Sequence, residues 1–174
     1  MRSTIATTPD EDRPSAQEDG HTRVSLVEGD TLGSYRIVRP LGSGAMGAVF
    51  EAVHEDLGRR VALKVLLDER ATRTTARERF FREARAAARV CHPGVVQVHD
   101  MDVDAHGTPY LVMDLLAGET LAERLTRGPL APEEIVAVLA PALEGVASAH
   151  EAGVIHRDLK PSHILLVPTP DGPP

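Results

Sequence analysis

The sequence has very little lysine, cysteine and aromatic content. It carries two lysines against 17 arginines, one cysteine, three Phe, two Tyr and no Trp. A single cysteine excludes an intrachain disulfide and fits a reducing compartment, and we expect Cys91 to be a small buried hydrophobe. So few aromatic rings argue against a platform that stacks nucleic-acid bases. The two lysines therefore draw attention, because lysine supplies a compact, rotatable point charge that arginine does not.

Long hydrophobic runs and excess positive charge are also missing. No run approaches the roughly 18 apolar residues of a membrane-spanning helix, and residues 1–30 lack the apolar stretch of a secretory signal. The net charge of −7 argues against a nucleic-acid surface, since binding to a phosphate backbone needs a net basic face. The sequence therefore predicts a globular, cytoplasmic protein with no membrane segment and no nucleic-acid partner.

The first half of the chain favours a disordered leader followed by a β-sheet. Residues 1–30 combine the acidic cluster Asp10–Asp12 with scattered Pro and Gly and show no aliphatic periodicity, which is typical of a disordered segment. From Tyr35 onward, β-rich runs alternate with turn residues, notably at Glu55–Arg59 and Asp104–Thr108, which predicts an antiparallel sheet of five strands. The expected strands are Tyr35–Leu41, Ala48–His54, Arg60–Leu67, Val95–Met101 and Tyr110–Met113.

One helix is expected to interrupt this sheet, over Thr74–Val90. Its apolar stripe at helical spacing consists of Phe80, Ala84, Ala87 and Ala88. Glu83 lies three residues after Phe80 and four before Ala87, so we expect it to face inward, where a carboxylate needs a cationic partner. The other side is expected to be a solvated arginine face, formed by Arg79, Arg82, Arg85 and Arg89.

Two further helices are expected in the second half, at Thr120–Thr126 and Glu133–Glu151. Pro132 opens the longer one, and acidic residues fill its first turn, where the helix dipole favours them. Pro141 lies inside that helix and removes a backbone hydrogen bond at a cost of about 3 kcal/mol, so we expect a kink or a break near Ala137–Pro141. We expect one apolar side of this helix to lie exposed, namely Ile135, Leu139, Leu143 and Val146.

The pattern Gly42-x-Gly44-x-x-Gly47 is a weak signal by itself, since several nucleotide-binding folds share it. A dinucleotide site would place a helix directly after the glycines, whereas a β-like run, Val49–Val53, follows here. A strand–turn–strand hairpin can lay its backbone N–H groups over phosphates, and glycine permits close approach. The motif is thus consistent with a phosphate-binding hairpin, with a glycine-rich hairpin that binds nothing as the alternative.

Lys64 lies in an alternating strand, on the same face as Ala62 and Leu66. A lysine on a strand is usually a solvated residue. The glycine hairpin lies 17 residues upstream and Glu83 lies 19 residues downstream. This combination predicts a phosphate ligand that a carboxylate holds in place.

Four motifs together resemble the opening part of a protein kinase: Gly42–Val49, Val61–Lys64, Glu83 and His156–Pro161. Their order and spacing match from Tyr35 to Val167. The Lys160-Pro161 ending resembles the serine/threonine kinases, and the Gly-Ala-Met-Gly style resembles the bacterial, eukaryotic-like branch. The resemblance implies an α+β, protein-kinase-like fold, with an N-lobe and hinge at 31–116 and a partial, mainly helical C-lobe at 117–174.

The resemblance also implies a function and a set of site residues. Family members bind ATP and Mg²⁺ and transfer the γ-phosphoryl group of ATP to a hydroxyl of a protein substrate. By resemblance, Lys64 reaches the α- and β-phosphates and pairs with Glu83, Asp158 accepts the proton of the Ser/Thr hydroxyl, and Lys160 neutralises the transferring group. Met113 falls at the gatekeeper position before the hinge. The implied nucleotide-binding set is Leu41, Gly42, Ser43, Gly44, Ala45, Met46, Gly47, Val49, Ala62, Lys64, Met113, Asp114, Leu116 and Leu165.

The sequence departs from the family pattern at two places. His163 stands where the family has an Asn that binds Mg²⁺, and an imidazole suits softer metals than Mg²⁺. A role in packing or hydrogen bonding within the loop is the favoured interpretation of His163, with a specialised metal ligand as the alternative. A structural role is also favoured for His156. The family's Asp-Phe-Gly is expected about a dozen residues after position 163, and Asp171-Gly172 comes too soon and lacks the Phe.

These departures leave three hypotheses. The first is a fragment of a serine/threonine kinase that is nearly inactive on its own. The second is a pseudokinase, or a nucleotide-binding interaction module without turnover. The third is a fragment that does not fold stably.

Overall fold

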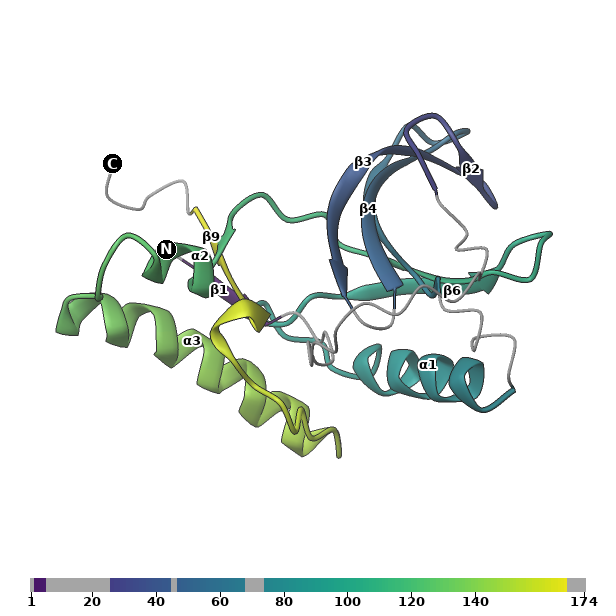
Figure 1. Cartoon of the computed structure of the whole chain (residues 1–174). Helices are drawn as coiled ribbons and strands as arrows, with labels where there is room; N and C mark the ends of the chain where they lie inside the picture. Colours follow the sequence, from purple (N-terminus) through teal and green to yellow (C-terminus); the bar gives the residue numbers. More distant parts are fainter. Residues whose placement is uncertain (1, 6–25, 45–46, 68–73, 169–174) are drawn as a thin grey trace, which may run out of the picture. The chain divides into compact units, whose positions relative to one another are not determined.

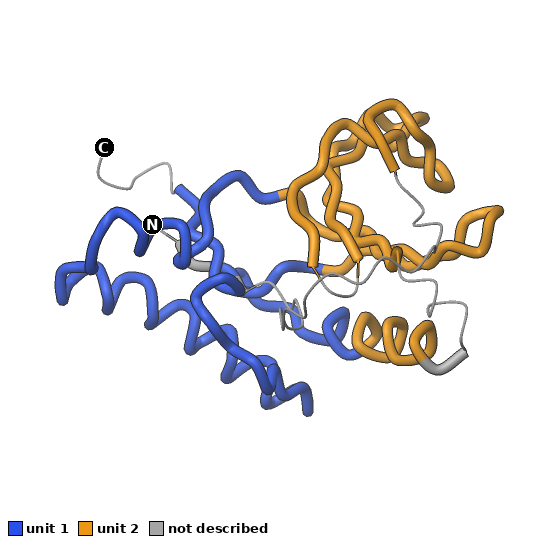
Figure 2. The backbone as a smooth tube through the Cα atoms, viewed as in Figure 1, with its two compact units in different colours: residues 1–8, 86–97, 116–174 blue, residues 9–85, 98–115 orange. Residues whose placement is uncertain are grey.

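The computed structural model of the chain describes residues 2–5, 26–44, 47–67 and 74–168. They form two compact units (Figure 2). Unit 1 contains residues 1–8, 86–97 and 116–174, and unit 2 contains residues 9–85 and 98–115. The lobe limits expected from the sequence remain predictions.

Unit 2 is built on an antiparallel sheet with the strand order β2-β3-β4-β5-β7-β6. Figure 1 labels β2, β3, β4 and β6 of this sheet. Its strands are β2 (Thr31–Leu32), β3 (Tyr35–Gly44), β4 (Gly47–His54), β5 (Arg60–Val65), β6 (Val98–Val103) and β7 (Pro109–Met113). The five predicted strands are confirmed, with β2 as an additional short strand. β6 begins three residues later than predicted, because the Val95 N–H bonds to the His92 carbonyl and closes a turn there.

The core of unit 2 follows the period of two that a half-buried sheet requires. The side chains that alternate inward along β3, β4, β5 and β7 form one cluster, which includes Ile37, Phe50, Leu63, Val65 and Val112. Both predicted turns are confirmed as antiparallel connections. In the second, the Asp104 carboxylate accepts bonds from the backbone N–H groups of His106 and Thr108, at 2.9 and 2.7 Å.

Helix α1 (Thr74–Ala87) packs through Phe80 and Ala84 against Leu66 of unit 2 and Leu111 of β7. The predicted arginine face is exposed. Glu83, however, is exposed as well, which corrects the expectation that it faces inward. The stripe of Phe80, Ala84 and Ala87 takes the buried positions, and Glu83 lies at its edge.

Cys91 is exposed, so its predicted burial is wrong. The helix ends before it in a turn in which the Val90 N–H bonds to the Ala87 carbonyl. Val90, at 2% exposure, takes the buried position directly before the cysteine. A turn therefore directs Cys91 outward.

Unit 1 combines helices α2 (Leu121–Leu125) and α3 (Pro132–Glu151) with a sheet of order β1-β9-β8. The strands are β1 (Arg2–Ile5), β8 (Glu119–Thr120) and β9 (Ile164–Val167), and a 3₁₀ turn, η2, covers Pro161–His163. Both predicted helices are confirmed. Thr120 caps α2 in a reciprocal capping box with Glu123, an arrangement that satisfies two free backbone donors.

Helix α3 runs through Pro141 without a break. Of the two predicted alternatives, a kink or a break, the break is wrong. Val138 and Ala142 lie on either side of the proline and are both buried in the core of unit 1. Gly94 also lies against the helix, since a Cβ on Gly94 would come 2.9 Å from the Pro141 carbonyl oxygen. We attribute the continuity of the helix to this packing, which offsets the lost hydrogen bond. The apolar side chains of Ile135, Leu139 and Leu143 are exposed as predicted. The predicted exposure of Val146 is wrong, because this side chain is half-buried against the core of unit 1.

The interpretation of residues 1–30 as a disordered leader is wrong for the parts that the structure describes. Arg2–Ile5 form strand β1, which pairs antiparallel with β9, and Thr4 is 5% exposed. Leu26 packs against the core of unit 2. The acidic cluster lies outside the described residues. Within the described parts of the chain, no helix is long and apolar enough to cross a membrane.

Candidate functional site

The glycine hairpin connects β3 to β4, with Gly44 paired to Gly47 and Gly42 paired to Val49. Gly47 has φ +150°, and a Cβ there would overlap the carbonyl oxygen of Val65, so the fold itself requires a glycine. Gly42 and Gly44 have open space where a Cβ would lie. Packing within the described residues does not account for these two glycines, whereas close approach of another molecule to the backbone would.

The structure describes two of the four other hairpin residues that the sequence placed in the nucleotide-binding set. Leu41 and Ser43 are exposed on β3. Ala45 and Met46, which the sequence also placed in the nucleotide-binding set, lie outside the described residues. The described part of the hairpin is therefore an exposed stretch of strand backbone.

Alanine substitutions test whether the fold requires glycine at position 47 but not at position 44. Gly47→Ala is expected to lower the free energy of unfolding by roughly 2 kcal/mol or more, because the new Cβ meets backbone at a positive φ. Gly44→Ala is expected to leave it unchanged within about 0.5 kcal/mol. Urea denaturation measures both, and equal losses in the two variants would contradict the distinction.

Lys64 shares one face of the sheet with three other residues of the predicted set. It lies directly opposite Val49 on β4, while its strand neighbour Ala62 lies opposite Met113 on β7. Directly opposed residues of antiparallel strands project to the same face. The structure of unit 2 thus brings Lys64 together with three apolar side chains, Val49, Ala62 and Met113.

Burial of the Lys64 side chain lowers the pKa of its ammonium group, and the negative charge of Glu83 raises that pKa in turn. Glu83 also forms an ion pair along α1, with its Oε1 2.9 Å from Arg79 Nε and its side chain 45% exposed. The charge of Glu83 therefore acts on Lys64, while their direct pairing stays a prediction. A partly dehydrated ammonium of this kind attracts phosphate more strongly than a fully solvated one.

In unit 1, Asp158 lies at the centre of a network of contacts within its loop. Its Oδ2 lies 3.2 Å from Lys160 Nζ, and its backbone N–H donates to His156 Nδ1 at 3.4 Å. Its carbonyl oxygen lies 2.8 Å from His163 Nδ1. Arg157, directly before it, has φ +66°, a conformation that costs energy for a residue other than glycine. These contacts hold a carboxylate and an ammonium side by side.

His163 is 4% exposed, and burial lowers the pKa of its imidazole. Because a carbonyl can only accept, His163 Nδ1 carries the proton that bonds to Asp158. Its ring also stands beside that of His156, with ring centroids 5.2 Å apart. This environment agrees with the favoured interpretation, in which both histidines pack and hydrogen-bond within the loop.

The lowered pKa of His163 predicts a loss of stability in acid. The imidazole of the unfolded chain binds a proton near the ordinary pKa of about 6.5, whereas the folded chain binds it only at a lower pH. The contribution of neutral His163 to the free energy of unfolding is therefore complete above that pH. It is lost as pH falls through the lowered pKa of the folded state. We expect the unfolding free energy of the wild type to fall more than that of His163→Asn between about pH 7.5 and 5. The exposed His106→Asn is the control, and parallel pH profiles for wild type and His163→Asn would contradict the prediction.

The described residues do not fit a complete Mg²⁺ site. Mg²⁺ needs near-octahedral coordination by oxygen, and His163 offers a buried nitrogen ring whose Nδ1 is already bonded to Asp158. Within the described ranges, no three His, Cys, Asp or Glu residues are grouped so as to hold a metal ion. His163, the metal ligand that the sequence suggested, is therefore poorly suited to Mg²⁺.

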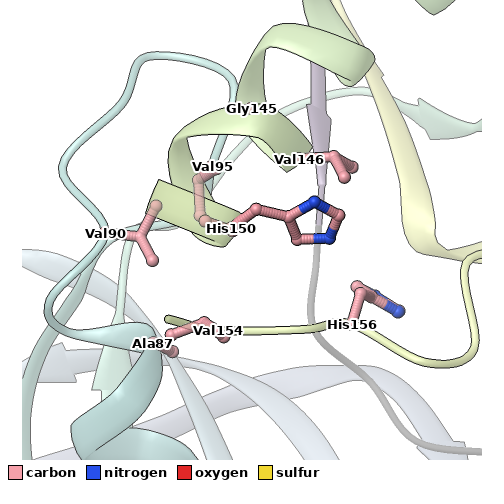
Figure 3. Close-up of a pocket in the computed structure, with 9 residues that line it drawn as sticks. Ala87, Val90, Val95, Gly145, Val146, His150, Val154 and His156 are labelled. Atoms are coloured by element: carbon pink, nitrogen blue, oxygen red, sulfur yellow. The ribbon is translucent and has the colours of Figure 1, made fainter. Parts of the chain in front are cut away.

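A small pocket of unit 1 has a different character (Figure 3). Its lining is largely aliphatic, with Val90, Val95, Val146 and Val154, and two imidazoles, His150 and His156, complete it. The Nε2 atom of His156 is buried without a hydrogen-bond partner in the described structure. An apolar lining does not suit phosphate groups. This pocket is therefore not the nucleotide site.

Comparison with known proteins identifies the family. The family model for the protein kinase domain matches residues 35–171. The chain belongs to the protein kinase family. The fold and the family predicted from the sequence are therefore confirmed.

Several bacterial kinases are similar to this kinase chain. It is 44% identical over 142 residues to the serine/threonine-protein kinase PknA of Mycobacterium tuberculosis, covering 79% of this chain and 33% of PknA. It is 42% identical over 134 residues to the serine/threonine-protein kinase pkn2 of Myxococcus xanthus, covering 77% of this chain and 16% of pkn2. The crystal structure of the M. tuberculosis PknI kinase domain matches with a TM-score of 0.70 at 32% identity, covering 83% of this chain and 60% of that domain. The chain thus spans a third or less of these two curated relatives.

The remaining predicted residues of this kinase chain divide between the units. Met113 ends β7, and Asp114 follows it in unit 2, half-buried. Leu116 and Leu165 belong to unit 1, together with Asp158, Lys160 and His163. Sequence reasoning missed His99, which bonds to the Asp114 side chain. No local pattern signals this contact, because it depends on how β6 pairs with β7.

Proposed function

We propose that this chain is the ATP-binding part of a serine/threonine protein kinase. The observation that carries the proposal is Lys64, a partly buried cation on the sheet face that also presents Val49, Ala62 and Met113. The apolar side chains suit an adenine ring, and the ammonium suits phosphates. The open space at Gly42 and Gly44 supports close approach of those phosphates to the hairpin.

The proposed reaction of the complete protein is phosphoryl transfer to a protein hydroxyl. The Ser/Thr oxygen attacks the γ-phosphorus, the bond to the bridging oxygen of ADP breaks, and the Asp158 carboxylate takes the hydroxyl proton. Lys160, next to Asp158, supplies positive charge for the transferring group. The names of the bacterial relatives, all serine/threonine kinases, support this substrate class.

The same proposal includes the metal ion that accompanies ATP and the compartment of the protein. Members of the family use ATP with a divalent metal ion, and we propose Mg²⁺ as the ion that accompanies ATP, with no role for His163 as its ligand. The single cysteine supports a reducing compartment, the cytoplasm.

Titration with ATP tests the binding step. Isothermal titration calorimetry of this chain is expected to show saturable binding of ATP, and no saturable binding with or without Mg²⁺ would contradict the proposal. For the transfer step, the full-length protein is expected to phosphorylate a protein substrate, and Asp158→Asn is expected to bind ATP yet lose transfer. The alternative, a module that binds nucleotide without turnover, predicts that the full-length protein binds ATP and transfers no phosphoryl group. The names of the bacterial relatives do not support this alternative.

A further inference from the structure

Strand β6 contains a bulge at His99. Val98 pairs with Met113 and Asp100 pairs with Val112, so His99 is an extra residue opposite a continuous stretch of β7. A bulge of this kind redirects the side chain of its extra residue. Here it occurs beside the point at which β7 ends and the chain continues into Asp114.

The His99 side chain reaches Asp114 across the two strands. Its Nε2 lies 2.6 Å from Asp114 Oδ1, a short distance typical of a hydrogen bond to a charged group. Arg59 Nη2, from the turn between β4 and β5, lies 3.3 Å from the same nitrogen. One ring nitrogen either donates or accepts, so the bond to the carboxylate requires that Nε2 carries the proton. Arg59 then contributes positive charge beside the pair rather than a second hydrogen bond.

This contact matters because of where Asp114 lies. The β7 ladder ends at Met113, which shares its sheet face with Lys64 and Ala62. Asp114 is the first residue beyond it, so the Asp114 segment borders the apolar face that suits the adenine ring in the proposed function. Both partners are partly buried, with side chains 30% and 37% exposed, so their hydrogen bond is only partly screened by water.

We propose that His99 is a positioning residue that holds the Asp114 segment in the conformation that receives the adenine base. The inference rests on the proposed function and deepens it. His99 acts on the base end of the nucleotide and not on its phosphates, because Lys64 and the glycine hairpin serve the phosphate end. The bond from Nε2 to Asp114, and not the imidazole ring as such, carries the effect.

Two ligands separate the base end from the phosphate end, namely ATP and inorganic tripolyphosphate. We expect His99→Ala to weaken ATP binding about fivefold while tripolyphosphate binding stays unchanged. His99→Gln is expected to recover most of the ATP affinity, because its amide N–H can donate to Asp114. His106→Ala, a change at an exposed histidine in the neighbouring turn, is the matched control and is expected to alter neither affinity.

The outcomes distinguish this inference from the proposed function. Unaltered ATP affinity in His99→Ala, equal weakening of both ligands, or failure of His99→Gln to recover affinity would each overturn the role of His99 while leaving ATP binding established. A wild-type chain that binds neither ligand would overturn the proposed function, and the inference with it. Unfolding midpoints measured for every variant identify any change that acts through loss of fold.

Discussion

Lys64→Met is expected to weaken ATP binding by roughly 10- to 150-fold, the equivalent of losing a hydrogen bond to a charged group worth about 1.5–3 kcal/mol. The fold is expected to remain intact. Burial lowers the pKa of the Lys64 ammonium, because the partly buried position disfavours the charged form. Methionine has a similar length and carries no charge, so it fits the half-buried position without that desolvation cost. Calorimetric titration and urea denaturation measure the two effects separately.

Arg82→Met is the matched control for Lys64→Met. It also replaces a cation with methionine, but Arg82 lies on the exposed arginine face of α1. ATP affinity is expected to stay at the wild-type value in this variant. If Lys64→Met bound ATP as tightly as the control, Lys64 would not be a phosphate ligand and the proposed site would be wrong.

Removing both arginines that flank Glu51 is expected to destabilise the chain by about 3–5 kcal/mol. The Glu51 side chain is 3% exposed in the middle of β4, with its Oε2 2.8 Å from Arg39 Nε of β3 and its Oε1 bonded to Arg60 of β5. Both arginine side chains are about 60% exposed, so they lose little hydration. The double variant Arg39→Met with Arg60→Met leaves a buried carboxylate without either cation, and urea denaturation measures the loss.

Removing the Glu51 carboxylate instead of the arginines is expected to change the free energy of unfolding little. Glu51→Met in the wild-type background leaves two solvated arginines, and in the double-variant background it removes the unpaired buried charge. We therefore expect the triple variant to recover most of the stability lost in the double variant, since a buried ion pair replaced by apolar side chains is often neutral. A triple variant as unstable as the double variant would show that the arginines stabilise the sheet through something other than Glu51.

Much of the fold could be predicted because its signals are local. Along β5, every second side chain, Val61, Leu63 and Val65, enters the core of unit 2, and such a period of two can be seen in the sequence. Helix α2 follows from Thr120 and Glu123, three residues apart. Where packing competes with local preference, prediction failed. Pro141 predicted a kink or a break in α3, and the break is absent from a helix in which Val138 and Ala142 are buried on either side of the proline.

In the candidate site, too, some features could be predicted from the sequence and others depend on packing. The glycine hairpin and Lys64 could be predicted as partners because strands β3, β4 and β5 follow one another along the chain and pair in that order. The orientation of Glu83 could not, because three apolar residues of α1 compete for the same buried face and leave the carboxylate at its edge. The packing and hydrogen bonding of His163 in its loop agree with the interpretation favoured from the sequence.

By itself, the sequence determined the family and the order of strands and helices, because motifs and spacing along the chain carry that information. Only the tertiary structure decided that Arg39 and Arg60 flank Glu51, that His99 bonds to Asp114, and that Arg2–Ile5 pair with β9. These contacts join residues that lie on different strands or directly after one. They depend on strand register and on competition for buried space, which no local pattern records.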